Sequence, residues 1–171
     1  MHSILSELKA VFEALPEASI QNAAQAIQSH NRIFVYAAGR SGLMLKAFAM
    51  RLAQMGRSVY VVGETVTPAI EEEDLLIVAS ASGTTHSTCH YAKCAKEAGA
   101  NIFVITANTH SPLTEISPAN VILPTPSKDS AGSRQIMGSL FEQALLLFWD
   151  AVVAVCPRDT AAMRQRHANL E

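Results

Sequence analysis

The sequence predicts an α/β fold, a three-layer, doubly wound arrangement in which helices cover both faces of a five-stranded parallel sheet. Five short apolar runs alternate along the chain with longer stretches of helical pattern. These runs are rich in β-branched residues and nearly continuous in hydrophobicity, which is typical of strands buried on both faces. The chain has 171 residues, of which 49% are hydrophobic, and this size predicts one domain with its own core.

The expected elements follow one another regularly. Two helices, at about 3–14 and 17–30, precede the first strand. Strands are expected at 32–36, 58–62, 75–79, 101–106 and 120–123. Helices are expected between and after them at about 43–56, 86–98, 112–117, 134–155 and 158–168. The single domain would thus comprise N-terminal helices to about residue 30, an α/β core over about 31–155, and a C-terminal helix and tail over about 156–171.

Composition excludes several classes of partner. Thirteen basic and fifteen acidic side chains give a formal net charge of −2, with no basic excess to bind a nucleic acid backbone. The N-terminus lacks the features of a signal peptide, and the apolar stretch 140–155 is shorter than the ~20 residues that a membrane span needs. Cys89, Cys94 and Cys156 form no CxxC pair, which favours small buried thiols in a reducing cytoplasm. We therefore expect a cytoplasmic protein without a membrane partner.

A glycine-containing turn follows the first strand. In Ala37-Ala-Gly-Arg-Ser-Gly42, Gly39 and Gly42 permit a tight turn, and the following helix start offers N–H groups to an anion. The dinucleotide fingerprint GxGxxG is not matched, because Ala37 holds the first glycine's place and Glu64 comes only after Gly63. A purely structural strand–helix turn and an anion site both remain open.

The third strand ends in a loop rich in hydroxyl groups, Ser80-Ala-Ser-Gly-Thr-Thr-His-Ser-Thr88. One or two of these hydroxyls could simply cap the following helix. A phosphate group, however, needs several hydroxyl and amide donors that converge on one point, and this loop supplies them. The triphosphate-binding pattern GxxxxGK[ST] is absent, so the loop favours a phosphorylated small molecule.

Histidine and cysteine side chains recur on the helix expected at 86–98. His86, Cys89, His90 and Cys94 have i, i+3, i+4 and i+8 spacing. Ligands on a single helix cannot easily surround a zinc ion. We expect no metal site, and we interpret these residues as helix surface and core.

The long helix at 134–155 combines an apolar surface with one polar arc. At 100° per residue, the arc holds Gln135, Ser139, Glu142, Gln143 and Asp150. It could be a solvated stripe, or it could line a cleft where partial burial would raise the pKa of Glu142 toward that of a useful base. Periodicity leaves both interpretations open. The apolar remainder is wider than one side of a sheet can cover, which predicts burial by another subunit.

Two segments are expected to be mobile by default. The loop Thr125–Ser133 is rich in Pro, Gly and Ser, which oppose regular structure. The ending Met163–Glu171 is expected to fray, although Arg164, Arg166 and His167 could instead form a basic arm that reaches a phosphorylated ligand.

The motifs at 38–42 and 80–88, together with the five-strand pattern, resemble the sugar isomerase (SIS) domain. More narrowly, further segments resemble the 6-phospho-3-hexuloisomerase family: Phe48-Ala-Met-Arg-Leu52, Gly63-Glu-Thr-Val-Thr-Pro68, Ser111-Pro-Leu113, Gly138-Ser-Leu-Phe-Glu142 and Arg166-His-Ala-Asn-Leu-Glu171. The resemblance runs from the first helix to the last residue.

This resemblance implies interconversion of D-arabino-3-hexulose 6-phosphate and fructose 6-phosphate through an enediolate, in the ribulose monophosphate route of formaldehyde fixation. It also implies the absence of a cofactor and a homo-oligomer, commonly a tetramer. Functional coupling to 3-hexulose-6-phosphate synthase would follow.

The resemblance also implies site residues. Glu142 would be the enolising base, with His167 assisting proton movement. Substrate contacts would come from Ser41, Ser80, Ala81, Ser82, Gly83, Thr84 and Thr85. A wider set of candidate contacts comprises Gly39, Arg40, Arg51, Glu64 and Arg166. The sequence departs from the family at three positions: Ala81 and Thr84 replace a glycine and a glutamate of the usual SGSGET loop, and Ala37 replaces a glycine.

Two alternative functions remain. One is a different SIS isomerase, acting on arabinose 5-phosphate or sedoheptulose 7-phosphate. The other is a non-catalytic phosphosugar-binding regulatory module. Such modules normally accompany a DNA-binding domain, for which the residues before the first strand leave no room.

Overall fold

The computed structural model describes residues 1–128, 132–167 and 169 of the chain. Its elements, in chain order, are α1 (His2–Glu13), α2 (Ala18–Ser29), β1 (Arg32–Tyr36), α3 (Gly39–Gln54), β2 (Ser58–Val61), β3 (Leu75–Ser80), α4 (His86–Glu97), β4 (Asn101–Thr106), α5 (Pro112–Ile116), β5 (Ala119–Ile122), the 3₁₀ turn η1 (Ile136–Gly138), α6 (Ser139–Val155) and α7 (Thr160–Gln165).

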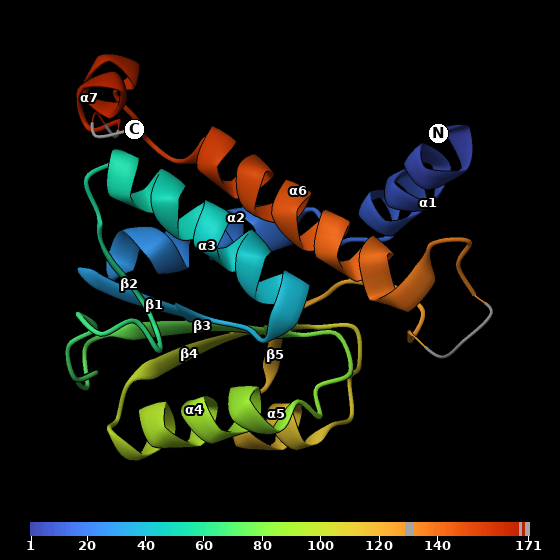
Figure 1. The fold of residues 1–171 in the computed structure, drawn as a ribbon, viewed down its shortest axis with the longest axis horizontal. Helices are drawn as coiled ribbons and strands as arrows, with labels where there is room; N and C mark the ends of the chain where they lie inside the picture. Colours follow the sequence, from blue (N-terminus) through green and yellow to red (C-terminus); the bar gives the residue numbers. More distant parts are fainter. Residues whose placement is uncertain (129–131, 168, 170–171) are drawn as a thin grey trace.

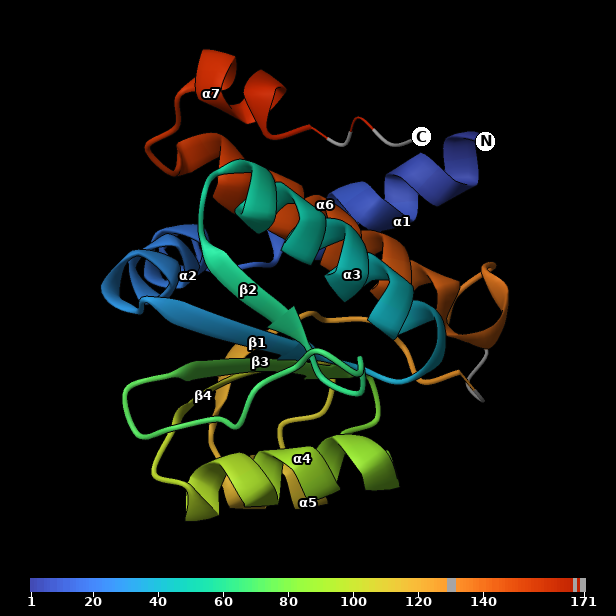
Figure 2. The ribbon, with the colours of Figure 1, turned by 60° about the vertical axis from the view of Figure 1, so that its left-hand side comes forward.

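The strands form one parallel sheet in the order β2-β1-β3-β4-β5. Helices α1, α2, α3 and α6 cover one face, and α4 and α5 cover the other (Figures 1 and 2). The predicted three-layer α/β class is therefore confirmed. The chain leaves β1 toward β2 on one side and then returns to β3 on the other. The crevice for a ligand is accordingly expected beside the carboxyl ends of β1 and β3.

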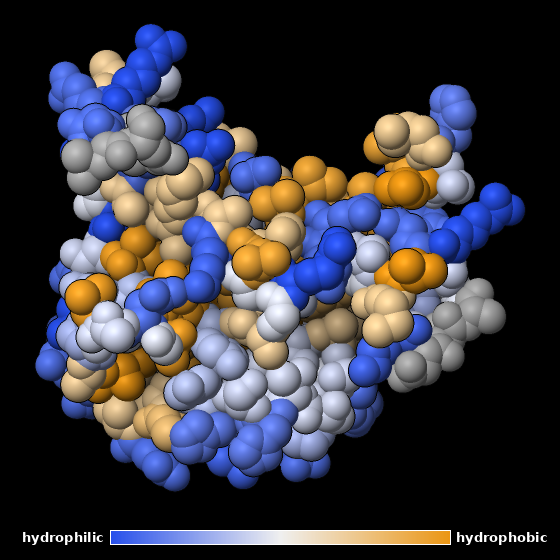
Figure 3. Space-filling model, viewed as in Figure 1, coloured by the Kyte–Doolittle hydropathy of each residue, from blue (hydrophilic) through white to orange (hydrophobic). Residues whose placement is uncertain are grey.

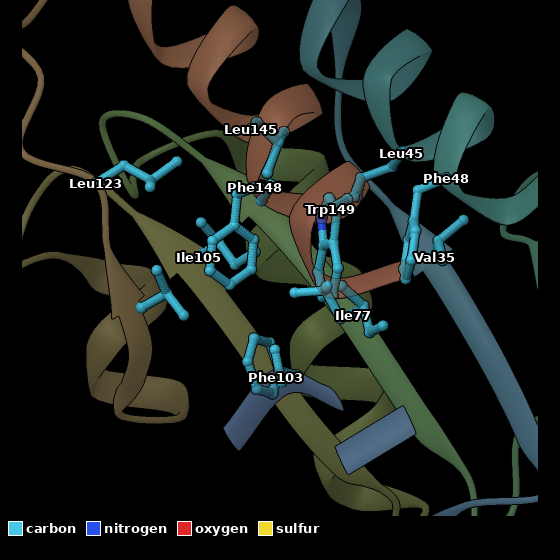
Figure 4. Packing of buried hydrophobic residues seen from close by; sticks show 14 of the residues in the cluster. Val35, Leu45, Phe48, Ile77, Phe103, Ile105, Leu123, Leu145, Phe148 and Trp149 are labelled. Carbon is cyan, nitrogen blue, oxygen red and sulfur yellow. The ribbon is translucent and has the colours of Figure 1, made fainter. Parts of the chain in front are cut away.

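Both faces of the central strands are apolar, which explains their continuous hydrophobic pattern. Along β1, Ile33 and Val35 belong to the core cluster under α3 and α6, whereas Phe34 belongs to the cluster under α4 and α5. On the first of these faces, the Trp149 ring stacks on Phe48 with 4.0 Å between ring centroids (Figure 4). Burial on this face fixes where α6 lies on the sheet.

The expected helix at 134–155 is wrong in its first turn. Residues 136–138 form a separate 3₁₀ turn, and α6 begins only at Ser139. The break lies at Met137 and Gly138, whose φ angles are 57° and 81°. A left-handed conformation at a non-glycine residue costs roughly 1–2 kcal/mol and cannot continue a right-handed helix. As a result, Glu142 lies in the first turn of α6.

Other boundaries differ by a few residues. Helix α3 begins at Gly39 rather than at 43, so Arg40 and Ser41 belong to its first turn. Helix α7 ends at Gln165 rather than at 168, a residue that lies outside the described part of the chain. The earlier start of α3 places residues 39–42 of the motif in its first turn, where the sequence predicts a loop.

By length and composition alone, Ile136–Val155 could cross a membrane. The chain instead uses one face of α6 as core: Leu140, Phe141, Ala144, Leu145, Phe148, Trp149 and Val152 are buried. The sheet and helices α1, α2 and α3 thus cover this face of the helix. Of the large apolar side chains on α6, Leu147 and Val155 stay exposed, at 42% and 45%.

Candidate active site

A cavity of about 540 Å³ opens at the carboxyl ends of the strands. Its walls come from the start of α3, the loops after β3 and β4, the segment after β5, and the start of α6. Ser41, the hydroxyl-rich loop, Lys128 and Glu142 all line it. Residues that are a hundred positions apart in the sequence therefore meet at the switch point of the sheet.

Internal hydrogen bonds hold the hydroxyl-rich loop, residues 80–85, in a tight shape. The Ser80 and Thr85 hydroxyls lie 2.9 Å apart, and the Gly83 N–H donates to Ser80 Oγ at 3.1 Å. The Ser82 and Thr84 hydroxyls also lie 2.9 Å apart. Four of the loop's side-chain oxygens are thus ordered before any ligand binds.

Gly83 lets this loop pack closely against the start of α5. Its φ is 67°, and a Cβ added there would lie 2.1 Å from Ser111 Oγ. The Gly83 carbonyl in turn accepts a hydrogen bond from Leu113 N at 3.0 Å. Only glycine combines this backbone conformation with such a close approach.

Three helices, α3, α4 and α6, begin at the cavity. Their N-cap residues are Ala38, Thr85 and Gly138, and no side chain caps any of the three. The interpretation of the Ser/Thr loop as a helix cap is therefore wrong, because the Thr85 hydroxyl pairs with Ser80 instead. The free N–H groups and the positive ends of the helix dipoles make this end of the sheet attractive to an anion.

Glu142 faces Arg40 at the same cavity. The Arg40 Nε donates to Glu142 Oε2 at 2.5 Å, and the Glu142 side chain is only 13% exposed. Asp150, farther along α6, is exposed. The polar arc on α6 is therefore not one solvated stripe: its N-terminal end lines a cleft, and Glu142 is a largely buried carboxylate beside a cation.

Glu64 and Gly39 line a neighbouring cavity of about 400 Å³, which lies between the start of α3 and the end of β2. Lys46 Nζ lies 2.7 Å from Glu64 Oε1, and this ion pair lowers the pKa of Glu64 below its ordinary value. Glu64 is thus paired with Lys46 at the surface, and it does not line the main cavity.

Arg51, Arg166 and His167 lie at the opposite end of α3. Arg51 bonds to the Gln54 side chain at 2.9 Å, and Arg166 donates to the Gln54 carbonyl at 3.3 Å. Helix α3 has 16 residues and spans roughly 23 Å between this end and the cavity. Within one chain, the structure therefore does not bring the tail to Glu142 (Figure 1).

Sequence reasoning missed part of the cavity lining. Asn108 after β4, together with Thr125 and Lys128 after β5, lines the cavity. The rule that ligands bind beyond strand ends would have indicated both segments. The composition of 125–133 indicated only a flexible loop, of which 129–131 lie outside the described residues. The Thr125 hydroxyl is buried and has no partner among the described residues, so a ligand can use it.

The histidine and cysteine side chains on α4 take no part in this cavity. Cys89 donates to the Gly83 carbonyl, and Cys94 lies 3.7 Å from His90 Nε2. No cluster of three or more potential metal ligands occurs within residues 1–128, 132–167 and 169. The expectation of small buried thiols holds for Cys156, but Cys94 is exposed.

Comparisons with known proteins agree with the fold. The SIS domain family model matches residues 26–147. The chain is 46% identical to 3-hexulose-6-phosphate isomerase of Mycobacterium gastri over 86% of this chain and 78% of that protein. It is 40% identical to 3-hexulose-6-phosphate isomerase of Bacillus subtilis over 98% and 95% of the two chains.

A solved structure also superimposes over nearly the whole chain. It is a Methanococcus jannaschii protein for which the crystal structure infers a function of 3-hexulose-6-phosphate isomerase. The TM-score is 0.87 at 31% identity, over 99% of this chain and 98% of that one. The chain therefore belongs to the SIS domain family and, within it, to the 3-hexulose-6-phosphate isomerases.

Proposed function

We propose that this enzyme interconverts D-arabino-3-hexulose 6-phosphate and fructose 6-phosphate through an enediolate. The observation that carries the proposal is the cavity itself, which combines a largely buried carboxylate, Glu142, with the hydroxyl-rich loop. The relatives named above act, by their names, on hexulose 6-phosphate. A carboxylate and a set of neutral donors are the groups that such an isomerisation needs.

The reaction moves a carbonyl group between C3 and C2 of the sugar phosphate. The Glu142 carboxylate takes the C2 proton, a C2=C3 double bond forms, and the C3 carbonyl oxygen becomes an oxyanion that is then protonated. The proton gained at O3 is matched by the one that the O2 hydroxyl loses, C2=O forms, and Glu142 returns its proton to C3. The sugar is oxidised at C2 and reduced at C3, so the step balances without a cofactor.

The phosphate is assigned to the loop at 80–85 and to the start of α4. The N–H groups there have no side-chain cap, and the ordered hydroxyls surround them. Lys128 adds a positive charge to the cavity wall. Binding of the phosphate at this end would hold the reacting carbons near Glu142, which lowers the entropy cost of the proton transfer.

Arg40 supports the developing negative charge on the sugar. Its Nε is engaged by Glu142, while the side chain is 62% exposed and keeps further N–H donors. Such donors stabilise an enediolate oxygen more strongly than the neutral ground-state carbonyl. Arg40 thus pairs with the base and serves the oxyanion.

The cellular setting follows from the substrate. The enzyme would act in the ribulose monophosphate route of formaldehyde fixation, directly after 3-hexulose-6-phosphate synthase, in the cytoplasm. The thiols of Cys89, Cys94 and Cys156 are free, which fits a reducing compartment.

We also propose a homo-oligomer, a tetramer, in which the tail of one subunit serves the cavity of another. Apolar side chains are exposed on the face of the molecule that Figure 3 shows. The exposed large apolar side chains of α1, α3 and α6 include Leu5, Leu43, Met50 and Leu147. An exposed apolar surface of this kind is typical of a protein–protein interface. Since Arg166 and His167 lie away from their own cavity, only a neighbouring subunit can bring them to one.

Purified protein should convert D-arabino-3-hexulose 6-phosphate to fructose 6-phosphate without added metal or cofactor. The measurement is a substrate panel that also contains arabinose 5-phosphate and sedoheptulose 7-phosphate, with kcat/KM determined for each. Preference for either of the latter would assign a different SIS isomerase. Binding of phosphosugars without turnover of any would indicate a regulatory module.

Gly83→Ala should raise KM for the phosphorylated substrate at least about tenfold, because the added Cβ displaces the loop that holds the phosphate. The matched control is Gly63→Ala, where φ is also positive but the added Cβ meets no atom within 4 Å. Its KM should change less than about twofold. Equal KM values for the two variants would remove the loop from phosphate binding.

Glu142→Gln should lower kcat by about 100-fold or more, because the amide keeps the shape of the side chain but cannot accept the proton. In D₂O the wild type should incorporate deuterium at C3 of the fructose 6-phosphate, and the variant should not. Asp150→Asn on the exposed part of α6 is the control. Normal turnover of Glu142→Gln would assign proton transfer to another group.

The tail is tested by subunit mixing. His167→Ala and Glu142→Gln homo-oligomers should each be nearly inactive, yet their random co-assembly should recover about a quarter of wild-type activity if an isologous pair exchanges tails. Deletion of residues 163–171 should leave a folded but weakly active oligomer in light scattering. An active truncated protein, or a monomeric wild type, would contradict the shared site.

A further inference from the structure

The segment that leads into α6 is strained and lines the active-site cavity. Met137 and Gly138 both contribute to the cavity wall, and both have left-handed backbone conformations. A non-glycine residue keeps such a conformation only where its surroundings hold it. The same two residues set the direction in which α6 starts, and Glu142 lies in the first turn that follows.

A carboxylate from the other end of the chain holds this segment. Glu7 on α1 accepts hydrogen bonds from three consecutive residues: Ser133 Oγ donates to Oε2 at 2.7 Å, Arg134 N donates to Oε1 at 2.9 Å, and Gln135 Nε2 donates to Oε2 at 3.1 Å. Ser133 Oγ also accepts from Gln135 N at 2.9 Å. Residues 133–135, which precede Met137 and Gly138 in this segment, therefore donate hydrogen bonds to both carboxylate oxygens of Glu7 on α1.

Helix α1 is a rigid support for this contact. Leu8, the next residue after Glu7, and Val11 are buried in the core cluster that also contains Leu140 and Phe141 of α6. In Figure 1, α1 lies beside the N-terminal end of α6. The Glu7 carboxylate thus connects α1 to the segment before α6, and apolar side chains of these two helices already share one core cluster.

We propose that Glu7 is a positioning residue of the active site, which fixes the Glu142 carboxylate through the segment 133–138. Glu7 is not among the residues that line the cavity. It acts by limiting the backbone conformations available to the first turn of α6. The kinetic part of this inference rests on the isomerase function proposed above, whereas the structural part does not.

The carboxylate must be ionised to accept all three hydrogen bonds. The Arg134 N–H, the Ser133 hydroxyl and the Gln135 amide lower the pKa of Glu7 below its ordinary value of 4.5, and the charge of Arg134 acts in the same direction. Among the described residues, Arg134 is the charged group that acts on this carboxylate. A lowered pKa means that the contact stabilises the fold above pH 4.5 and is lost as the pH falls through the lower, folded-state value.

Glu7→Ala should lower kcat by about 10- to 100-fold, because a small displacement of the base is costly, while KM changes little since the phosphate loop is untouched. Glu7→Gln keeps one carbonyl oxygen as an acceptor, so its kcat should lie between those of the wild type and Glu7→Ala. Glu13→Ala is the matched control on the same helix, where the exposed carboxylate pairs with Lys9 at 3.5 Å. A kcat for Glu7→Ala equal to that of the control would overturn the proposal.

Hydrogen exchange of the peptide that contains Arg134 provides a readout independent of catalysis. Its amide should be less protected in Glu7→Ala than in the Glu13→Ala control. In the wild type its protection, corrected for the intrinsic exchange rate at each pH, should fall once acid protonates Glu7. Should Glu7→Ala fail to fold, Ser133→Ala removes the shortest of the three bonds from the other side, with the same expected loss of kcat. Unchanged exchange in a folded Glu7 variant would refute the contact, even if the wild type proved to have another activity.

A rise in KM that matches the loss of kcat would show that Glu7 acts on substrate binding, and it would also overturn the positioning role. The double variant Glu7→Gln/Ser133→Ala should lose less activity than the sum of the two single free-energy effects, because the two residues act as one unit. Full additivity would show that they act separately and would contradict the proposal.

Discussion

The burial of one face of α6 is the interaction on which the rest of this structure depends. Trp149 and Phe148 are almost wholly buried between the sheet and α3, and Trp149 stacks on Phe48. Helices α1 and α2 then pack on the other sides of α6. Removal of so much aromatic surface from water fixes the axis of α6, because each large side chain is worth several kcal/mol. The position of Glu142 at the start of the helix follows from that axis.

The charges of the site are few and are placed by backbone geometry. Three helix N-termini without side-chain caps supply positive ends, Arg40 and Lys128 supply cations, and Glu142 supplies the carboxylate. The loop at 80–85 presents neutral hydroxyl and amide donors to the same cavity. In the function proposed above, these donors would hold the phosphate, while Arg40 pairs with the carboxylate that would accept and return the proton.

The errors of the sequence-based prediction concern the same region. The apolar periodicity of α6 extends back to about residue 134, so periodicity predicts a helix through Ile136 and Met137. The chain breaks at Met137 and Gly138, and just before the break residues 133–135 donate hydrogen bonds to Glu7, more than 120 positions away. No local rule contains this contact.

The sequence by itself determined the fold class, the order of the strands and helices, and the two motifs that begin at 38 and 80. These features are local: hydrophobic periodicity, glycine at tight turns, and hydroxyl groups before a helix are each visible within a dozen residues. Only the tertiary structure decided whether Glu142 lies in solvent or in a cleft, and that Arg40 rather than Glu64 faces it. It also separated the tail from the cavity of its own chain. These features depend on how helices such as α3 and α6 pack against each other on the sheet, and contacts between segments distant in the sequence determine that packing.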